Sequence, residues 1–179
     1  MKATGIVRRI DELGRIVIPK EIRRTQRIRR GDPLEIFTTG EGEVIFKKYS
    51  PMREMAALAE QYAAVLARYT RLTAFICDKE QIIAAAGTGR RELAEQHIAR
   101  PLEQLLERHS SYFAGRDGEP RLPCQGSSRP LLAACPILTG GDTLGAIGIL
   151  AGEGTAQPTE AQHAAVELAA ALLAKQMEE

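Results

Sequence analysis

The strongest constraint on the fold is that the first 50 residues contain only short apolar runs separated by turns. These runs predict four strands: 5–10 (GIVRRI), 15–18 (RIVI), 34–38 (LEIFT) and 43–48 (EVIFKK). Turn-prone residues at 11–14 and 40–42 connect them in pairs. Pro19 suits the first turn of a helix, expected over 19–27. Such a ββαββ unit buries too little apolar surface to be stable alone, so we expect it to interleave with a second copy.

Charge is distributed unevenly along the 179 residues. The formal net charge is +1, but residues 1–50 carry 12 Lys and Arg against 7 Asp and Glu, a net of +5. Residues 51–179 carry 12 against 16, a net of −4. This asymmetry predicts an N-terminal unit that faces nucleic acid and an acidic second unit.

The helix expected over 19–27 gathers positive charge on one face. Its basic residues recur at i, i+3, i+4 and i+7 and share an arc of about 100°; they are Lys20, Arg23, Arg24 and Arg27. Ile22 lies almost opposite, where it can anchor the helix. Arg8, Arg9 and Arg15, on the neighbouring predicted strands, can extend the basic surface. Guanidinium groups bridge phosphate oxygens or the O6 and N7 of guanine, so the pattern predicts DNA contact, with a merely solvated charged face as the alternative.

The strings TGIVRRIDELGRIVIPKEIRRT and GDPLEIF…EVIFKKYSP resemble the AbrB family of bacterial transition-state regulators over residues 1–51. The resemblance implies a swapped-hairpin dimer, in which each protomer contributes strands to one interleaved barrel and a helix to one basic face. It also implies DNA contacts from Arg8, Arg15, Arg23 and Arg24. We add Arg9, Lys20 and Arg27 from the geometry alone. Gln26 departs from the family, which usually has an apolar residue there, and this weakens the expected grip of the helix on the barrel.

A second unit begins at the boundary Ser50-Pro51, which gives expected domains 1–51 and 52–179. Thr159 and Gln162 form a capping-box pattern that opens a helix to about Met177. Apolar runs and turn signals predict the other elements: a connecting helix at 52–69, strands at 73–78, 82–87, 131–138 and 143–152, a helical stretch at 91–109 interrupted near Pro101, a loop at 110–130 with one short strand, and a hairpin turn at 139–142. The fold class is α+β. The layout resembles family members that carry a C-terminal GAF domain and act in spore development.

The connecting helix carries apolar residues with a 3-4-3-4 spacing, which is typical of a coiled-coil seam. These residues are Met55, Leu58, Tyr62, Val65 and Tyr69. Helices from two dimers could pair through this seam and give a tetramer. A helix that simply lies on its own domain explains the same spacing, and the pattern leaves both interpretations open.

The sequence offers little for catalysis. It contains no P-loop, no GxSxG motif and no metal-ligand cluster, and His97, His109 and His163 lie far apart. We therefore predict no catalytic residue, no metal and no cofactor. Cyclic nucleotides are not proposed as ligands, because the relevant GAF domains carry an Asn-containing signature and this chain has no Asn. An unidentified small-molecule effector of the second unit remains open.

These patterns together predict a DNA-binding transcription regulator of stationary-phase or sporulation genes, whether activator or repressor. No apolar run reaches about 18 residues and the N-terminus lacks a signal core, so we expect a cytoplasmic, nucleoid-associated protein. One alternative is the antitoxin of a toxin–antitoxin pair. Another is an enzyme such as a free methionine sulfoxide reductase, for which Cys124 and Cys135 are the candidate cysteines.

Overall fold

The computed structural model describes residues 4–155 and 157–178. The chain separates into two compact units, and the division falls between Tyr49 and Ser50. This lies two residues before the boundary expected from the sequence. Within the described ranges, none of the helices combines the length and the hydropathy that a membrane crossing requires.

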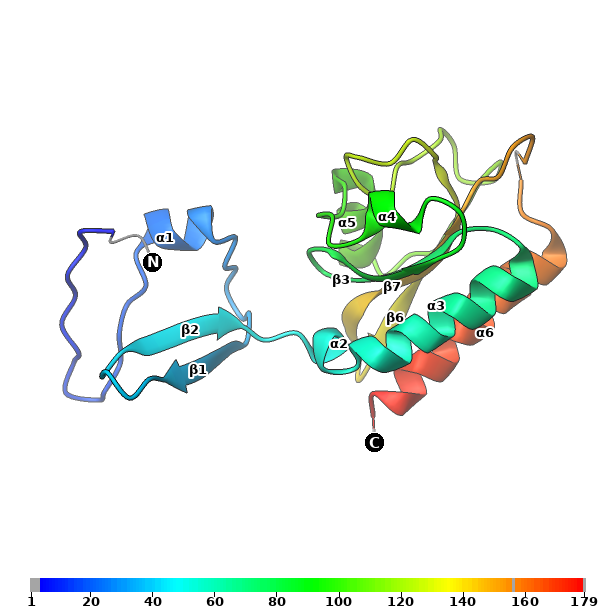
Figure 1. The fold of residues 1–179 in the computed structure, drawn as a ribbon. Helices are drawn as coiled ribbons and strands as arrows, with labels where there is room; N and C mark the ends of the chain where they lie inside the picture. The colour runs from blue at the N-terminus through cyan, green and yellow to red at the C-terminus, as the bar shows by residue number, and fades with distance from the viewer. Residues whose placement is uncertain (1–3, 156, 179) are drawn as a thin grey trace. The chain divides into compact units, whose positions relative to one another are not determined.

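In residues 4–49, the described part of the first unit, the chain forms one short helix and one hairpin, which can be followed in Figure 1. Its elements are α1 (Lys20–Thr25), β1 (Leu34–Thr38) and β2 (Val44–Lys48). The two strands are antiparallel, with Ile36 opposite Phe46. A backbone bond from Thr39 N to Glu43 O (3.0 Å) closes the turn, which confirms the hairpin predicted around residues 40–42.

The strands predicted at 5–10 and 15–18 are not formed in the single chain, although the turn between them is. A strand needs hydrogen-bond partners along its edge, and within this unit β1 and β2 pair only with each other. The apolar side chains of the two segments consequently face solvent. Val7 is 89% exposed and Val17 is 73% exposed.

The second unit is built on a five-stranded antiparallel sheet with the order β4-β3-β7-β6-β5. Its strands are β3 (Ala74–Asp78), β4 (Ile82–Ala86), β5 (Tyr112–Phe113), β6 (Leu131–Thr139) and β7 (Asp142–Leu150). The long hairpin β6–β7 turns at Gly140 and Gly141, whose φ angles of 59° and 89° suit the tight turn predicted there. The loop at 110–130 contains one short strand, β5, as expected.

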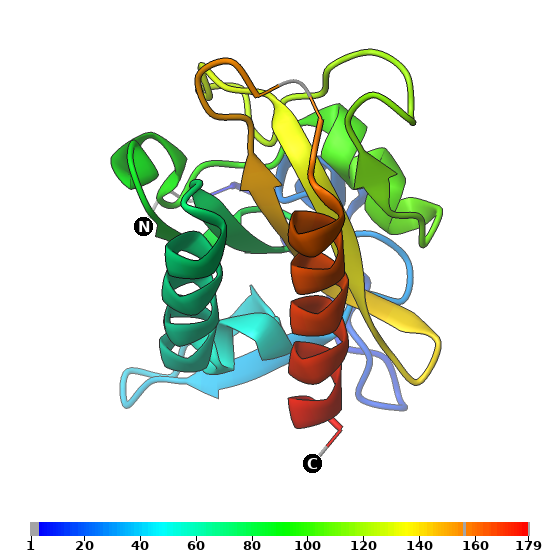
Figure 2. The same cartoon turned by 90° about the vertical axis from the view of Figure 1, so that its right-hand side faces the viewer.

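Helices cover both faces of this sheet. They are α2 (Pro51–Glu54), α3 (Ala56–Thr70), α4 (Arg90–Leu93), α5 (Arg100–Glu107) and α6 (Glu160–Gln176). The long helices α3 and α6 run side by side over one face, whereas α4 and α5 lie over the other (Figures 1 and 2). Alternate residues of β3 serve the two resulting cores: Ile76 packs on the α3–α6 side and Phe75 on the α4–α5 side. This layered arrangement confirms the predicted α+β class.

The helix predicted as continuous at 52–69 is broken, and the interruption predicted near Pro101 instead precedes this residue, which lies in the first turn of α5. The helix expected at 52–69 begins as α2, is interrupted at Met55 and resumes as α3. The stretch expected at 91–109 forms only α4 and α5, separated by six residues that are not helical. In that gap Ile98 N donates to Glu80 O (2.9 Å), so the backbone bonds with neighbouring segments instead of with a helix. Helix α6 begins as predicted, with Gln162 N donating to Thr159 Oγ1 (3.2 Å).

Substitution of Gly145 should destabilise the sheet, because a Cβ at this position would lie 1.9 Å from Cys77 O on the neighbouring strand. We expect Gly145→Ala to lower the free energy of unfolding by about 3 kcal/mol, as overpacking against backbone does. Gly126→Ala is the matched control, because a Cβ there meets nothing closer than 3.7 Å. Denaturant unfolding followed by circular dichroism measures both. Equal stability of the two variants would contradict the packing described for β3 and β7.

Candidate nucleic-acid interface

A tight turn positions the first candidate arginine, Arg15. The carboxylate of Asp11 accepts hydrogen bonds through Oδ1 from Leu13 N (3.0 Å) and Arg15 N (2.8 Å). Its other oxygen, Oδ2, accepts from Arg15 Nε (2.7 Å). The side chain of Arg15 stays 71% exposed in this ion pair. The turn therefore orders Arg15 and leaves most of its guanidinium open to a ligand.

These bonds hold the pKa of the Asp11 carboxyl below its ordinary value, chiefly through the Arg15 backbone N–H and next through the Arg15 side chain. Because the folded pKa is the lower one, the turn is stabilised above the ordinary Asp pKa. That stabilisation is lost as the pH falls through the lowered folded value. Sequence analysis did not select Asp11, although an Asp that opens a turn is a known signal for such side-chain-to-backbone bonds.

Helix α1 presents the central basic residues. Lys20, Arg23 and Arg24 are all exposed, whereas Ile22 between them is half-buried. This agrees with the predicted division into a basic outer face and an apolar anchor. Arg23 and Arg24 also lie in the last turn of the helix, where positive side chains are favoured by the helix dipole.

Arg27 does not belong to the helix, which corrects its predicted place on the basic arc. Helix α1 ends at Thr25, with Gln26 as C-cap, and Arg27 adopts a left-handed conformation (φ 52°). A bond from Ile28 N to Arg23 O (2.7 Å) completes this Schellman-type end. The Lys48 ammonium donates to Arg27 O and so ties β2 to the end of the helix. Arg27 remains exposed, but its direction is set by the cap and not by helical periodicity.

All seven candidate DNA-binding residues lie in the first unit and are exposed. The turn orders Arg15 and the helix orders Lys20, Arg23 and Arg24. Arg8 and Arg9 lie on the segment that forms no strand in the single chain. The structure thus supplies two ordered basic groups, and the intervening acidic residues Glu12 and Glu21 are exposed beside them.

The first unit also exposes many of its apolar side chains to solvent. Among the large ones are Ile10, Leu13, Ile36, Val44 and Phe46. Both core clusters described for the chain belong to the second unit. A two-stranded hairpin with one short helix is at best marginally stable in water. The first unit therefore needs a further surface to cover its apolar residues.

The residues of the predicted seam lie in two different environments. Leu58 and Tyr62 pack against the core of their own unit, and Met55 is half-buried at the helix break. Val65 and Tyr69 instead face solvent, at 59% and 66% exposure. On the neighbouring helix α6, Leu168 and Leu172 are exposed as well. Sequence analysis missed these two leucines because it considered the connecting helix alone.

The three thiols are buried in the second unit. Cys124 packs in the core on the α4–α5 side and Cys135 in the core on the α3–α6 side, so the sheet separates them. Burial raises the pKa of Cys77 and Cys124, and it raises that of Cys135 to about 11. These thiols are poor nucleophiles near neutral pH, because only the thiolate reacts readily.

The Asp11 turn can be tested by titration. We expect the Asp11 carboxyl to titrate below the ordinary value for Asp, and we expect Arg15→Gln to raise its pKa only part of the way back. The backbone N–H of Arg15, which is the larger cause, survives that substitution. Carboxyl ¹³C shifts measured against pH report the values. Arg9→Gln is the control and should leave Asp11 unchanged. An Asp11 pKa insensitive to Arg15→Gln would contradict the side-chain bond.

Comparison with known proteins follows the division into two units. Residues 54–178 match the family described as Stage V sporulation protein T C-terminal, transcription factor. Residues 7–54 match the one described as Antidote-toxin recognition MazE, bacterial antitoxin. Stage V sporulation protein T of Bacillus subtilis (strain 168) is 44% identical over 181 residues, which covers 100% of both chains. Transition state regulatory protein AbrB of the same organism is 59% identical over 51 residues, 28% of this chain and 52% of that protein.

Solved structures resemble the second unit in fold. The GAF domain of a phosphoenolpyruvate-protein phosphotransferase from Coxiella burnetii has a TM-score of 0.51 and 17% identity, covering 69% of this chain and 82% of its own. A type II free methionine-R-sulfoxide reductase from Thermoplasma acidophilum has a TM-score of 0.53 and 14% identity, covering 70% and 94%. At such identities the likeness concerns the fold alone. The chain belongs to the family of stage V sporulation protein T, transcription factors that join an AbrB-like N-terminal unit to a GAF-like second unit.

Proposed function

We propose that this protein is a sporulation-related transcription regulator that binds double-stranded DNA through the basic surface of its first unit. The observation that carries the proposal is the ordered, exposed pair Arg23 and Arg24 on α1, with Arg15 held ready by Asp11. The relative over this unit, AbrB, is named a transition state regulator, and a solved structure of its N-terminal part is described as a DNA recognition domain.

Affinity in this mechanism comes mainly from phosphate contacts. Each Lys or Arg that neutralises a phosphate releases counterions, so binding weakens as salt concentration rises. Arg23 and Arg24 are also able to reach base edges, because a guanidinium can donate two bonds to guanine. Sequence preference at positions without base contact comes from the shape and deformability of the DNA. A regulator of this kind works in the cytoplasm, at the nucleoid.

The first unit acts as a dimer in this proposal. Its exposed apolar residues need cover, and segments 5–10 and 15–18 have strand-forming sequences without strand partners. A second copy supplies both, because each copy can pair its free segments with those of the other. The result is an interleaved barrel that brings two α1 helices to one basic face. DNA contact by Arg8 and Arg9 depends on this pairing, which would order their segments.

Two dimers join through the second unit. The outward side of the α3–α6 layer carries Val65 and Tyr69 on one helix and Leu168 and Leu172 on the other, all exposed. Burying such side chains against a second copy is favourable by about 25 cal/mol for each Å² of apolar surface removed from water. This surface replaces the narrower five-residue seam, in which Leu58 and Tyr62 already pack within their own unit.

The two alternatives are less well supported. An antitoxin function accords with the match over residues 7–54. Its toxin-neutralising segment, however, would typically be short and disordered when free, whereas residues 50–178 form a unit with two hydrophobic cores. A reductase function would require paired cysteines, and Cys124 and Cys135 lie in cores on opposite faces of the sheet. We therefore propose no enzymatic activity.

Replacing Arg23 and Arg24 together by alanine should abolish specific DNA binding and leave folding and assembly intact, because both side chains are exposed. The salt dependence should also weaken, with the slope of log K against log salt falling by about 0.9 for each lost phosphate contact. Mobility-shift titrations at several salt concentrations, with light scattering on the same samples, measure both quantities.

Arg90 and Arg91 provide a matched control, because they form the corresponding exposed arginine pair in the second unit. Their double alanine variant should bind DNA like the unaltered protein. If the Arg23/Arg24 variant kept full affinity and the full salt slope, α1 would have no part in DNA binding.

Aspartate at Val65 and Tyr69 should split the larger assembly into dimers, because it places charge on the exposed apolar layer without disturbing either core. DNA affinity should fall with it, since an assembly with two basic faces engages the second face at a raised effective concentration. Sedimentation velocity and DNA titration test this. Leu122→Asp, at an exposed loop position, is the control and should change neither. A Val65/Tyr69 variant that stays the same size would exclude the layer as the interface.

A further inference from the structure

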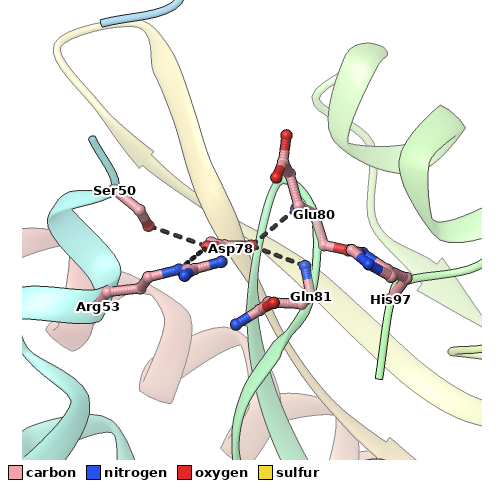
Figure 3. Close-up of polar contacts among 6 residues, drawn as sticks. All are labelled: Ser50, Arg53, Asp78, Glu80, Gln81 and His97. Atoms are coloured by element: carbon pink, nitrogen blue, oxygen red, sulfur yellow. Dashed lines mark hydrogen bonds and ion pairs between the residues drawn. The ribbon is translucent and has the colours of Figure 1, made fainter. Parts of the chain in front are cut away.

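One carboxylate in the second unit is buried and yet accepts four hydrogen bonds. Asp78 ends strand β3 and is 4% exposed. Its Oδ1 accepts from Glu80 N and Gln81 N, both at 2.7 Å. Its Oδ2 accepts from Ser50 Oγ (3.0 Å) and from Arg53 Nε (3.1 Å). Figure 3 shows the two pairs of donors converging on the carboxylate from different segments.

The two oxygens of Asp78 serve different parts of the unit. Oδ1 fixes the turn between β3 and β4, whereas Oδ2 fixes the junction segment, residues 50–53, with which the second unit begins. A buried carboxylate that loses its donors is strongly destabilised, so neither set of bonds can be released without consequence for the other. The carboxylate thus connects the junction segment to the β3–β4 turn.

The side chain of Ser50, the N-cap residue of α2, donates to Asp78 and makes no N-capping bond to the helix, which is the usual role of a serine at this position. The side chain of Arg53 is half-exposed in its ion pair with Asp78, so the strength of this ion pair depends on the geometry of the contact more than on burial of the arginine. Both residues lie in the first turn that follows Tyr49, the last residue of the first unit.

The β3–β4 turn is also hydrogen-bonded to residues 96–98, which form a strap between α4 and α5. Glu80 O accepts from Ile98 N (2.9 Å) and lies 3.3 Å from His97 Nδ1. Ile82 N donates to Gln96 O (2.9 Å). A continuous set of hydrogen bonds therefore runs from residues 96–98 through the turn and Asp78 to the junction segment.

We propose that Asp78 is a latch that couples the strap at 96–98 to the junction segment carrying the first unit. With the latch closed, α2 is held on the second unit by the bonds of Ser50 and Arg53 to Asp78. Displacement of the strap would weaken the Oδ1 bonds and free the junction segment. The latch as a route of control over DNA binding rests on the proposed function, but its existence does not.

Hydrogen exchange of the full-length protein tests the latch directly. Arg53→Met removes one donor to Oδ2 and keeps the length of the side-chain stem, and Ser50→Ala removes the other. We expect each to speed exchange of the amides of residues 52–55 about tenfold, as loss of one charge-assisted bond would. Coupling further requires faster exchange at Glu80, Gln81 and Ile98, which neither substitution touches. Arg68→Met, at an exposed position on α3, is the control and should change none of these amides.

Asp78→Asn separates the two halves of the latch, because the amide keeps one carbonyl oxygen for the turn but loses the acceptor facing Arg53. In the Asp78→Asn variant, amide hydrogen exchange should rise most in the junction segment. The control Asp142→Asn, the same substitution at an exposed position, should leave exchange in the junction segment unchanged. If Arg53→Met and Ser50→Ala speed exchange only at residues 50–55 and leave Glu80, Gln81 and Ile98 unaltered, coupling through Asp78 is excluded.

DNA titration of the same variants separates this inference from the proposed function. If the unaltered protein binds DNA and the latch variants bind the same DNA with a different affinity, the latch controls DNA binding. If they speed exchange at both ends but leave affinity unchanged, the latch exists and its control over DNA binding is refuted. Failure of the unaltered protein to bind DNA would overturn the proposed function, while the exchange results would still decide whether the latch exists.

Discussion

The structure of this protein depends on a sheet that is buried on both faces. Antiparallel sheets often leave one face in water, but here α3 and α6 cover one side and α4 and α5 the other. Double burial explains the apolar composition of β3, β6 and β7. Within the sheet, Gly145 and Gly148 lie where atoms of a neighbouring strand leave no room for a side chain. The second unit therefore has two cores of its own, one on each face of the sheet.

The first unit has the opposite balance. Its apolar side chains lack a core of their own, while its cations are ordered by local bonds such as the Asp11 turn and the cap that follows α1. The turn and cap bonds join residues only a few positions apart, so they can form before any second copy covers the apolar side chains. In the proposed dimer, assembly would bring together basic groups whose backbone positions are already set by the turn and the helix. DNA binding and oligomerisation are accordingly linked in the proposed mechanism.

Likeness of fold gives little information about chemistry in the second unit. It resembles both a GAF domain and a methionine sulfoxide reductase, yet its thiols are buried and those of Cys124 and Cys135 lie on opposite faces of the sheet. Function on a shared fold resides in the site residues. In this chain Ser50 and Arg53 donate to Asp78 at the place where the chain enters the second unit, and the β3–β4 turn donates to the same carboxylate.

The sequence alone determined the elements that depend on local signals: the β1–β2 and β6–β7 hairpins and the capping box of α6. Tertiary structure decided the rest. Periodicity could not show that Arg27 leaves the helix, because the Schellman end depends on bonds beyond the pattern. Periodicity also could not show which seam residues are buried: Leu58 packs against the core of its own unit whereas Val65 is exposed, and this depends on the neighbouring elements. The role of Asp78 could not be predicted for the same reason: two of its four donors, Ser50 and Arg53, lie 28 and 25 positions before it, and only folding brings them to its carboxylate.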